Sequence, residues 1–415
     1  MPASVVSLVW LLLAALYIGA CKPHHPPLFF LKFWLECLTP ELPLRPADGV
    51  NGSLKTVHVA YASDSRNFAG LLNSMLSLSR HLKEPQACVI HLLVPHVDLA
   101  LARKLVRCFR QELALAPAVR LQGLLPLGFT LEPLPTDIRP DLALSPQAYA
   151  RWYLHTYLPA APRVIWLDTD TIVRSDIGEL YRMRMQHPIA AGLDTIGWTL
   201  GAELQNALEA GLDASLEQHF RRLGSRPLNS GVLVLDLERW RSGSIVRDLE
   251  RLTVAFSGFR WDQLPLQLRF QEGFDVLDWR WNRLHLGTLP FGAMPRRCIS
   301  EARILHWSHG SRKPWHGRGT MSRGPHDGLF EAYSPRDEAC LLAFNHGAGR
   351  PGVVPATRGG QESFTVRTPE RMRVDKSAST RLGSPELSTL LCHQSASRHT
   401  DEKPGTDTPS PLCCG

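Results

Sequence analysis

The sequence predicts an α/β fold built on a mostly parallel sheet of the doubly wound type. From residue 56 onward, short apolar runs of β-prone residues alternate with amphipathic helical segments. One run, Val164-Ile165-Trp166-Leu167, ends abruptly in Asp168-Thr169-Asp170, as expected of a buried strand with acids at its carboxyl end. Ligands of open α/β sheets bind beyond the carboxyl ends of the strands. We therefore expect the functional site to include Asp168 and Asp170.

The first half of the expected domain contains two strand–helix pairs, followed by a helix that leads into the acidic strand. The helix before the acidic strand has Ser145 as a plausible N-cap and Pro146 at its first position. Hydrophobic spacing predicts the remaining elements: strands over 56–62 and 88–94, helices over 69–82 and 99–115, and a proline-rich connection over 123–141.

The second half repeats the pattern with shorter strands. The run from Asn229 to Leu237 is a buried strand entered through a polar Asn-Ser-Gly turn. The other expected elements are a helix over 176–185, an amphipathic piece over 204–220, a helix after 261–263, and strands over 189–194, 274–277 and 302–305.

Length and composition limit the range of functions. With 415 residues and 44% hydrophobic residues, the chain has room for one large domain with tails, or for two domains. The formal net charge of +7 is modest, and the arginines cluster late in the chain. There is no compact basic and aromatic stripe and no recognition motif, so we expect no nucleic-acid partner.

The two ends differ from the middle. Residues 5–20 are apolar and uncharged and precede a proline-rich stretch, which is typical of a signal peptide or an uncleaved signal anchor. Asn51-Gly52-Ser53 is an N-glycosylation sequon. We expect a signal or anchor over 1–21, a proline-rich stem over 22–55, the folded domain over 56–320, and a low-complexity, largely disordered tail over 321–415.

Nine cysteines are scattered along the chain without a CxxC pair, which argues against a zinc ribbon. Cys88 and Cys108 lie in apolar stretches, and we expect both to be buried free thiols. In a secretory compartment some of the nine could form disulfides, but their spacing does not indicate which ones.

Two chemistries use an Asp-x-Asp at a strand end. In one, Asp168 and Asp170 hold Mn²⁺ or Mg²⁺ that bridges a nucleotide diphosphate while a glycosidic bond breaks. In the other, Asp168 is a nucleophile that takes a phosphoryl group and Asp170 is the general acid, as in haloacid-dehalogenase-like phosphatases. A third interpretation is a surface acid pair without chemistry.

Several further blocks resemble glycosyltransferase family 8, whose members are retaining nucleotide-sugar transferases of GT-A fold. The blocks follow the family's order: LSPQAYARWYLHTYLP before the acidic strand, Leu193-Asp194, NSGVLVLDL with Trp240, Asp262-Gln263, and HWSHGSRKPW. Arg280-Trp281-Asn282 and His285-Leu286-Gly287 resemble the galacturonosyltransferase-like and glycosyltransferase-8-domain branches. The resemblance implies a GT-A fold with a single mixed, mostly parallel sheet flanked by helices. A phosphatase would need a downstream lysine and a later acidic pair, for which we find no convincing match.

The resemblance also assigns roles. It implies a Mn²⁺ or Mg²⁺ site at Asp168, Asp170 and His306, and a UDP-sugar as donor. Donor-binding residues would be Ala62, Asp64, Asn67, Arg151, Asp168, Thr169, Asp170, Asn229, Gly310 and Lys313. Catalytic residues would be Arg151, Asp194, Asp262 and Gln263, with Gln263 nearest the reacting carbon of the sugar and acting through orientation and charge.

The resemblance and the amino terminus together predict a metal-dependent retaining transferase. It would move a hexose or pentose from the UDP-sugar to a glycan or protein acceptor in the lumen of the Golgi or ER, as a type II membrane protein or a secreted one. One departure concerns the last block, where His306 lies four residues before Gly310 instead of three. Either His306 remains the ligand and the loop bulges, or His309 replaces it. We expect His306, because it ends a strand directly. The extra residue also leaves open a GT-A domain with impaired catalysis that acts as a binding partner.

Overall fold

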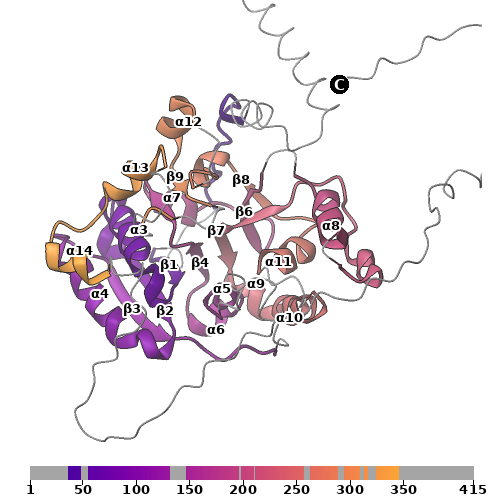
Figure 1. Ribbon diagram of the computed structural model, residues 1–415, viewed down its shortest axis with the longest axis horizontal. Helices are drawn as coiled ribbons and strands as arrows, with labels where there is room; N and C mark the ends of the chain where they lie inside the picture. Colours follow the sequence, from indigo (N-terminus) through magenta and orange to yellow (C-terminus); the bar gives the residue numbers. More distant parts are fainter. Residues whose placement is uncertain are drawn as a thin grey trace, which may run out of the picture. The chain divides into compact units, whose positions relative to one another are not determined.

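The computed structural model (Figure 1) describes most of residues 36–344. The described ranges are 36–47, 55–130, 146–195, 198–209, 211–256, 262–287, 294–308, 313–315 and 324–344. The predicted signal segment, the Asn51 sequon and residues 345–415 lie outside them. Among the described helices, none is both long enough and apolar enough to cross a bilayer.

The main sheet in the described part of the chain has seven strands, in the order β3-β2-β1-β4-β7-β6-β8. All neighbouring pairs are parallel except those that β7 makes with β4 and β6. The mixed, mostly parallel sheet predicted from the sequence is therefore confirmed. The strands are β1 (Val57–Ala62), β2 (Cys88–Val94), β3 (Ala118–Gly123), β4 (Arg163–Leu167), β6 (Ile189–Leu193), β7 (Leu228–Asp236) and β8 (Asp275–Leu277).

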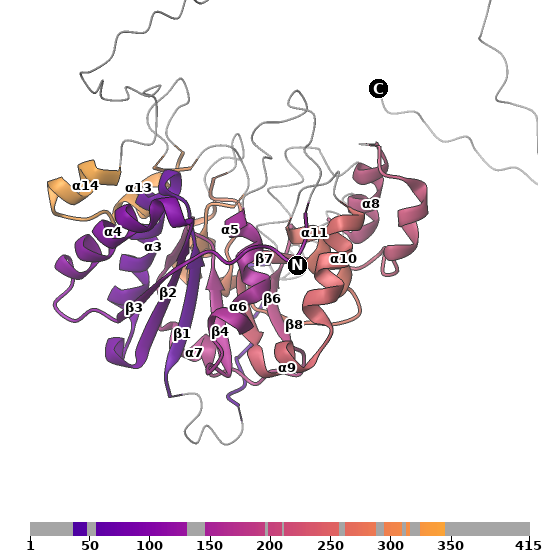
Figure 2. The ribbon, with the colours of Figure 1, turned by 90° about the horizontal axis from the view of Figure 1, so that it is seen from below.

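Side chains of β4 and β7 alternate between two hydrophobic cores, as the two-residue period of a strand requires. Ile165, Leu167 and Val232 face one core, whereas Trp166 and Leu233 face the other. Figure 2 shows helices on both sides of the sheet. The first core packs against α3 (Phe68–His81), α4 (Leu99–Gln111), α7 (Ile177–Tyr181) and α14 (Glu338–Phe344), and the second against α5 (Pro146–Tyr149), α6 (Leu154–Tyr157), α9 (Leu237–Ser242), α10 (Ile245–Ala255) and α11 (Gln263–Arg269).

A separate two-stranded sheet joins distant parts of the chain. β5 (Thr171–Val173) pairs antiparallel with β9 (Ile304–His306), with Thr171 opposite His306. The backbone amide of Trp307 also donates to the carbonyl of Asp170 over 2.9 Å. Residues 304–306 are thereby fixed beside the chain that leaves β4.

The sequence analysis did not predict β3. Its sequence AVRLQG contains the polar residues Arg120 and Gln122, and its residues are exposed or only partly buried. It is an edge strand, so its position comes mainly from the backbone ladder to β2, in which Ala118 pairs with Val89.

Two disulfides link the domain to segments outside the predicted domain limits. Cys108 of α4 is bonded to Cys340 of α14, so the prediction of a free thiol at Cys108 is wrong, while Cys88 is a buried free cysteine as predicted. Figure 1 shows α14 beside α4 although more than 200 residues separate them, in agreement with the sequence separation of 232 between the two cysteines. Spacing alone does not reveal such a pairing.

The packed region therefore extends beyond residue 320. Phe344 of α14 is buried in the first core, and Phe330 of α13 (Asp327–Glu331) is buried in a smaller apolar cluster that includes Trp307. The boundary predicted at 320 was placed where Gly, Ser and Arg begin to dominate the sequence, and it leaves α13 and α14 outside the domain.

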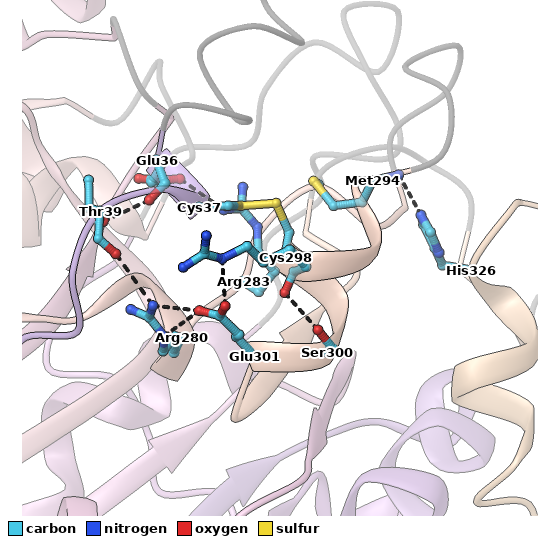
Figure 3. The surroundings of a disulfide bond; sticks show 11 residues. Glu36, Cys37, Thr39, Arg280, Arg283, Met294, Cys298, Ser300, Glu301 and His326 are labelled. Atoms are coloured by element: carbon cyan, nitrogen blue, oxygen red, sulfur yellow. Dashed lines mark hydrogen bonds and ion pairs between the residues drawn. A yellow bond between two sulfur atoms is a disulfide. The ribbon is translucent and has the colours of Figure 1, made fainter. Parts of the chain in front are cut away.

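The predicted stem likewise contributes to the packed structure. Cys37 is bonded to Cys298 of α12 (Arg296–Glu301), and Figure 3 shows Arg280 and Arg283 beside this disulfide. Glu36 forms an ion pair with the buried Arg283 at 3.0 Å. Residues 36–47 are thus held to the domain by covalent and ionic contacts instead of forming a separate spacer.

Two neighbouring histidines, His91 buried and His58 half-buried, lead to a first prediction, on pH. His58 Nδ1 of β1 lies 3.1 Å from His91 Nε2 of β2. Burial lowers the pKa of both rings, and that of His91 falls to about 3, helped by His58 and Arg120. Between pH of about 6.5 and 3 the unfolded chain binds more protons than the folded chain, so the free energy of unfolding must fall as the pH falls, by up to about 1.4 kcal/mol per pH unit for this group.

Urea unfolding at pH 7 and pH 5 should show a smaller loss of stability for His91→Gln than for the wild type. Equal losses in the two proteins, with the exposed-site variant His96→Gln as control, would contradict the assignment.

Candidate active site

The polar residues predicted from the sequence gather at one edge of the main sheet. Asp168 follows the carboxyl end of β4, and Asp194 follows that of β6. β7 runs in the opposite direction, so Asn229 at its beginning lies at the same edge. Ala62 and Asp64 follow the carboxyl end of β1, the parallel neighbour of β4. Because the strand order reverses between β1 and β4, this edge is the switch point at which open α/β sheets bind ligands.

Asp168 and Asp170 converge through a turn. The backbone amide of Thr171 donates to the carbonyl of Asp168 at 3.3 Å, and its hydroxyl does so at 2.8 Å. Asp168, Asp170 and His306 each present a ligand atom, and these atoms lie within 4.8 Å of one another. Thr169 occupies the middle of the turn and is half-buried.

Asp170 lies between two residues from the last block of the sequence. Its Oδ2 accepts a hydrogen bond from Lys313 Nζ at 2.7 Å, and Lys313 also donates to the carbonyl of Trp307 at 2.8 Å. Its Oδ1 lies 3.2 Å from His306 Nε2. Within the described part of the chain this buried oxygen has no hydrogen-bond donor in suitable geometry.

The charges around Asp170 keep it ionised despite burial. Burial alone would raise the pKa of this carboxyl, but the positive charge and the hydrogen bond of Lys313 oppose that rise, and the pKa lies far below its usual range. An ionised, buried oxygen without a donor is a strong ligand for a cation.

Arg151 connects the acidic turn to the predicted Asp262-Gln263 pair. Its guanidinium is buried and lies 3.3 Å from Asp168 Oδ1 and 3.0 Å from Asp262 Oδ2, over the ring of Trp166 at 4.7 Å. It also donates to the carbonyl of Ser230 at 2.6 Å. Burial raises the pKa of Asp262, the charge of Arg151 opposes this rise, and nearby Asp168 adds to it.

Gln263 is held in one orientation at the centre of the polar residues. Its Oε1 accepts from the backbone amide of Ser230 at 2.9 Å, from the hydroxyl of Ser230 at 3.1 Å and from Asn229 Nδ2 at 3.3 Å. Its Nε2 donates to Asp194 Oδ2 at 2.7 Å. An oxygen that already accepts three hydrogen bonds is a poor nucleophile, in agreement with a role in orientation.

The residues after β1 form a neighbouring group. Asp64 accepts hydrogen bonds from Arg66, from Asn67 Nδ2 at 3.0 Å and from Gln147 Nε2 at 2.9 Å. Gln147 belongs to α5, the helix that leads to Arg151. Ala62 is half-buried at the end of β1. Gly310 and the alternative ligand His309 lie outside the described residues.

Comparison with known proteins identifies the family. The model of a family described as "Glycosyl transferase family 8" matches residues 58–319. This chain belongs to glycosyltransferase family 8. It is 30% identical over 288 residues to "Probable galacturonosyltransferase-like 9" of Arabidopsis thaliana, which covers 67% of this chain and 71% of that protein. It is 29% identical over 234 residues to human (Homo sapiens) "Glycosyltransferase 8 domain-containing protein 2", which covers 51% of this chain and 64% of that protein.

A solved structure supports the same fold. The apo structure of the WbbM bifunctional glycosyltransferase superposes with a TM-score of 0.52 at 16% identity, over 72% of this chain and 52% of that one. The family 8 resemblance and the GT-A fold read from the sequence are therefore confirmed, and the chain is a glycosyltransferase. Membership of this family also decides against the phosphatase interpretation of Asp168.

The packing explains two of the family 8 blocks. In NSGV, a Cβ on Gly231 would lie 2.1 Å from His306 Cε1, so only glycine leaves room for this imidazole. In the KPW ending, the ring of Trp315 lies against Gly70 of α3 and 5.2 Å from the ring of Phe330. Trp315 anchors the segment from which Lys313 reaches Asp170.

Sequence reasoning assigned no role to three residues that contact the predicted site. Trp166 Nε1 donates to Asp168 Oδ1 at 2.8 Å, and Gln147 donates to Asp64. Asn282 accepts a hydrogen bond at Oδ1 from His306 Nδ1, over 2.8 Å. Two of these residues could have been found from the sequence: Trp166 lies two residues before Asp168, and Asn282 belongs to the block Arg280-Trp281-Asn282 that resembles the family.

The residues present fit a divalent cation. The ligand atoms of Asp168, Asp170 and His306 lie within 4.8 Å of one another, and two carboxylates with one imidazole are a set of donors that Mn²⁺ or Mg²⁺ would accept. The cluster also has more negative than positive charge, since four carboxylates lie among two cations: Asp168, Asp170, Asp194 and Asp262 with Arg151 and Lys313.

Proposed function

We propose that the protein is a metal-dependent, retaining glycosyltransferase that moves a hexose or pentose from a UDP-sugar to a glycan or protein acceptor. The observation that carries the proposal is the buried Asp170 Oδ1, which lacks a hydrogen-bond donor among the described residues and faces His306 Nε2 beside Asp168. Two carboxylates and an imidazole suit Mn²⁺ or Mg²⁺. The family membership supports a nucleotide-sugar donor.

In this proposal Asp168, Asp170 and His306 hold the cation, which supplies charge neutralisation to the departing nucleoside diphosphate. Lys313 Nζ lies 2.7 Å from Asp170 Oδ2, so its positive charge is close enough to help neutralise the departing diphosphate when the carboxylate binds the metal. Arg151 keeps Asp168 and Asp262 in place from a buried position and supplies a second cation at the same edge.

The sugar would contact the polar residues at the start of β7 and the end of β6. Gln263 and Asn229 are oriented by hydrogen bonds and Asp194 anchors the Gln263 amide, so these groups would bind hydroxyls without losing much conformational freedom. We assign Asp64 and Asn67 to the base or ribose, because they follow β1 at the neighbouring strand end. Ala62, Thr169 and Gly310 complete the proposed donor site.

The test is thermal unfolding of the full chain with UDP, with and without Mn²⁺. We expect UDP to raise the Tm several degrees only when Mn²⁺ is present, because the cation bridges the diphosphate and the protein. Absence of any UDP-dependent shift would count against the proposal. A Mn²⁺-dependent shift without hydrolysis of any UDP-sugar during long incubation would favour a catalytically impaired binding partner.

We also propose residence in the lumen of the Golgi or ER, either anchored by the amino-terminal segment or secreted. The two disulfides, Cys37–Cys298 and Cys108–Cys340, support an oxidising compartment. Protease protection in intact microsomes would test this location. Digestion of the domain without detergent would contradict it.

A further inference from the structure

Asn282 lies between the two halves of the proposed site. It follows the turn Trp279–Trp281 and is only 4% exposed. Its Oδ1 lies 2.8 Å from His306 Nδ1 and its Nδ2 lies 2.9 Å from Asn229 Oδ1. One side chain thus touches a proposed metal ligand and a proposed sugar-binding amide.

The directions of these hydrogen bonds can be deduced from one fixed donor. The backbone amide of Gly231 can only donate, and it donates to Asn229 Oδ1 at 3.0 Å. The atom of Asn282 that faces Asn229 Oδ1 must then be the amide nitrogen. Its carbonyl oxygen therefore faces His306 and can only accept a hydrogen bond, which Nδ1–H must donate.

This deduction determines the tautomer of His306 when the ring is neutral. With the proton on Nδ1, the lone pair is on Nε2, the atom 3.2 Å from Asp170 Oδ1. Two lone pairs facing each other at that distance repel unless a cation lies beside them. Metal-binding histidines commonly have such a partner on the other ring nitrogen.

The backbone holds Asn282 firmly in this position. The amide of the next residue, Arg283, donates to the carbonyl of Ile304 at 2.9 Å, and the amide of His306 donates to the carbonyl of Arg283 at 2.9 Å. Gly192 of β6 makes room for the side chain, since a Cβ there would lie 3.0 Å from Asn282 Cβ. The two partners are therefore on neighbouring rigid segments, not on independent loops.

We propose that Asn282 is a positioning residue that fixes His306 in the tautomer whose Nε2 binds the divalent cation. The inference rests on the metal dependence proposed above and adds a residue to which no role is assigned. It also implies that the backbone amide of Gly231, by donating to Asn229 Oδ1, fixes the direction of the hydrogen bonds that orient Asn229 and His306.

Calorimetric titration of the full chain with Mn²⁺, without nucleotide, tests the inference. Asn282→Ala should weaken Mn²⁺ binding by about 10- to 100-fold, the usual effect of losing such a partner. Asn282→Asp retains an acceptor for His306 Nδ1, so its Mn²⁺ affinity should stay within a few-fold of the wild type. The second carboxylate oxygen of this variant would face Asn229 Oδ1 without a hydrogen between them, so the variant should have a lower Tm than the wild type.

Asn73→Ala is the matched control. Asn73 is also buried, but it donates to the carbonyl of Phe330 and to Ser334, away from the proposed metal ligands. This variant should lose stability and keep the Mn²⁺ affinity. Wild-type affinity in Asn282→Ala, or equal weakening in Asn282→Ala and Asn282→Asp, would overturn the inference. If the wild type binds no Mn²⁺, the proposed metal dependence itself fails, which is a different result.

A second measurement reads the tautomer in the wild type, so it does not depend on the stability of the Asn282 variants. Proton–nitrogen NMR of the histidine rings in the wild type with bound Mg²⁺, with His306 assigned by comparison with His306→Gln, reports the tautomer. A proton on Nδ1 supports the role of Asn282. A proton on Nε2 overturns it.

Discussion

Asp170→Asn is expected to abolish Mn²⁺-dependent UDP binding and to lower transferase activity about 10³-fold, which corresponds to about 4 kcal/mol of lost stabilisation. The reason is that Asp170 is the most deeply buried acid of the acidic turn and contacts both His306 and Lys313. An amide in its place has no net charge and puts an NH₂ group where an anionic oxygen should face the cation.

The measurement is a titration of UDP with Mn²⁺ followed by thermal unfolding, together with transfer or hydrolysis of UDP-sugars. Stability must be measured separately, because removing one charge from a buried group of ionic contacts is itself destabilising. Asp236→Asn is the matched control: Asp236 ends β7 at the opposite edge of the sheet and caps α9, a role that Asn also fills. Equal UDP binding in the wild type and Asp170→Asn would refute the assignment of Asp170 as a ligand.

Gly231→Ala is expected to give the second large effect. The added methyl carbon would lie 2.1 Å from His306 Cε1 and 2.9 Å from both ring nitrogens. The imidazole is buried and fixed by Asn282, so it cannot move without breaking that hydrogen bond. We expect a loss of about 1–3 kcal/mol in unfolding free energy and a loss of Mn²⁺ binding of tenfold or more.

A double-mutant cycle separates this clash from other effects of alanine. In the His306→Ala background the methyl group meets empty space, so Gly231→Ala should then cost much less stability. Gly224→Ala serves as control, because a Cβ there meets nothing within 4 Å. If Gly231→Ala costs the same with and without the imidazole, steric exclusion by His306 is not the reason for the glycine.

The sequence predicted the elements that depend on local pattern. β2 was predicted at its observed bounds, and β1, β4 and β7 within a residue or two, because their apolar runs are bounded by polar turns. Asp168 and Asp170 were predicted as site residues because they directly follow an apolar run, and Asn229 was assigned through the family resemblance. The family blocks added His306 and Lys313, which no periodicity indicates.

Other features depended on contacts that no local pattern encodes. The sequence around Cys108 is typical of a buried thiol, and only the folded chain places α14 beside α4, where Cys340 pairs with it. The turn at Thr169 depends on the hydroxyl of Thr171 and on the pairing of β5 with β9, which joins residues more than 130 positions apart.

By itself, then, the sequence determined the alternation of strands and helices, the acids at the strand ends and the family. Only the tertiary structure determined how these parts meet: β7 runs antiparallel, which puts Asn229 beside the acids, and β9 brings His306 to Asp170. Asn282 shows the difference most clearly, since its role comes from the partners on its two sides and from the amide of Gly231, which fixes the direction of each hydrogen bond. Hydrophobic periodicity records which side of an element is buried, whereas the direction of a hydrogen bond depends on partners that only the folded chain brings together.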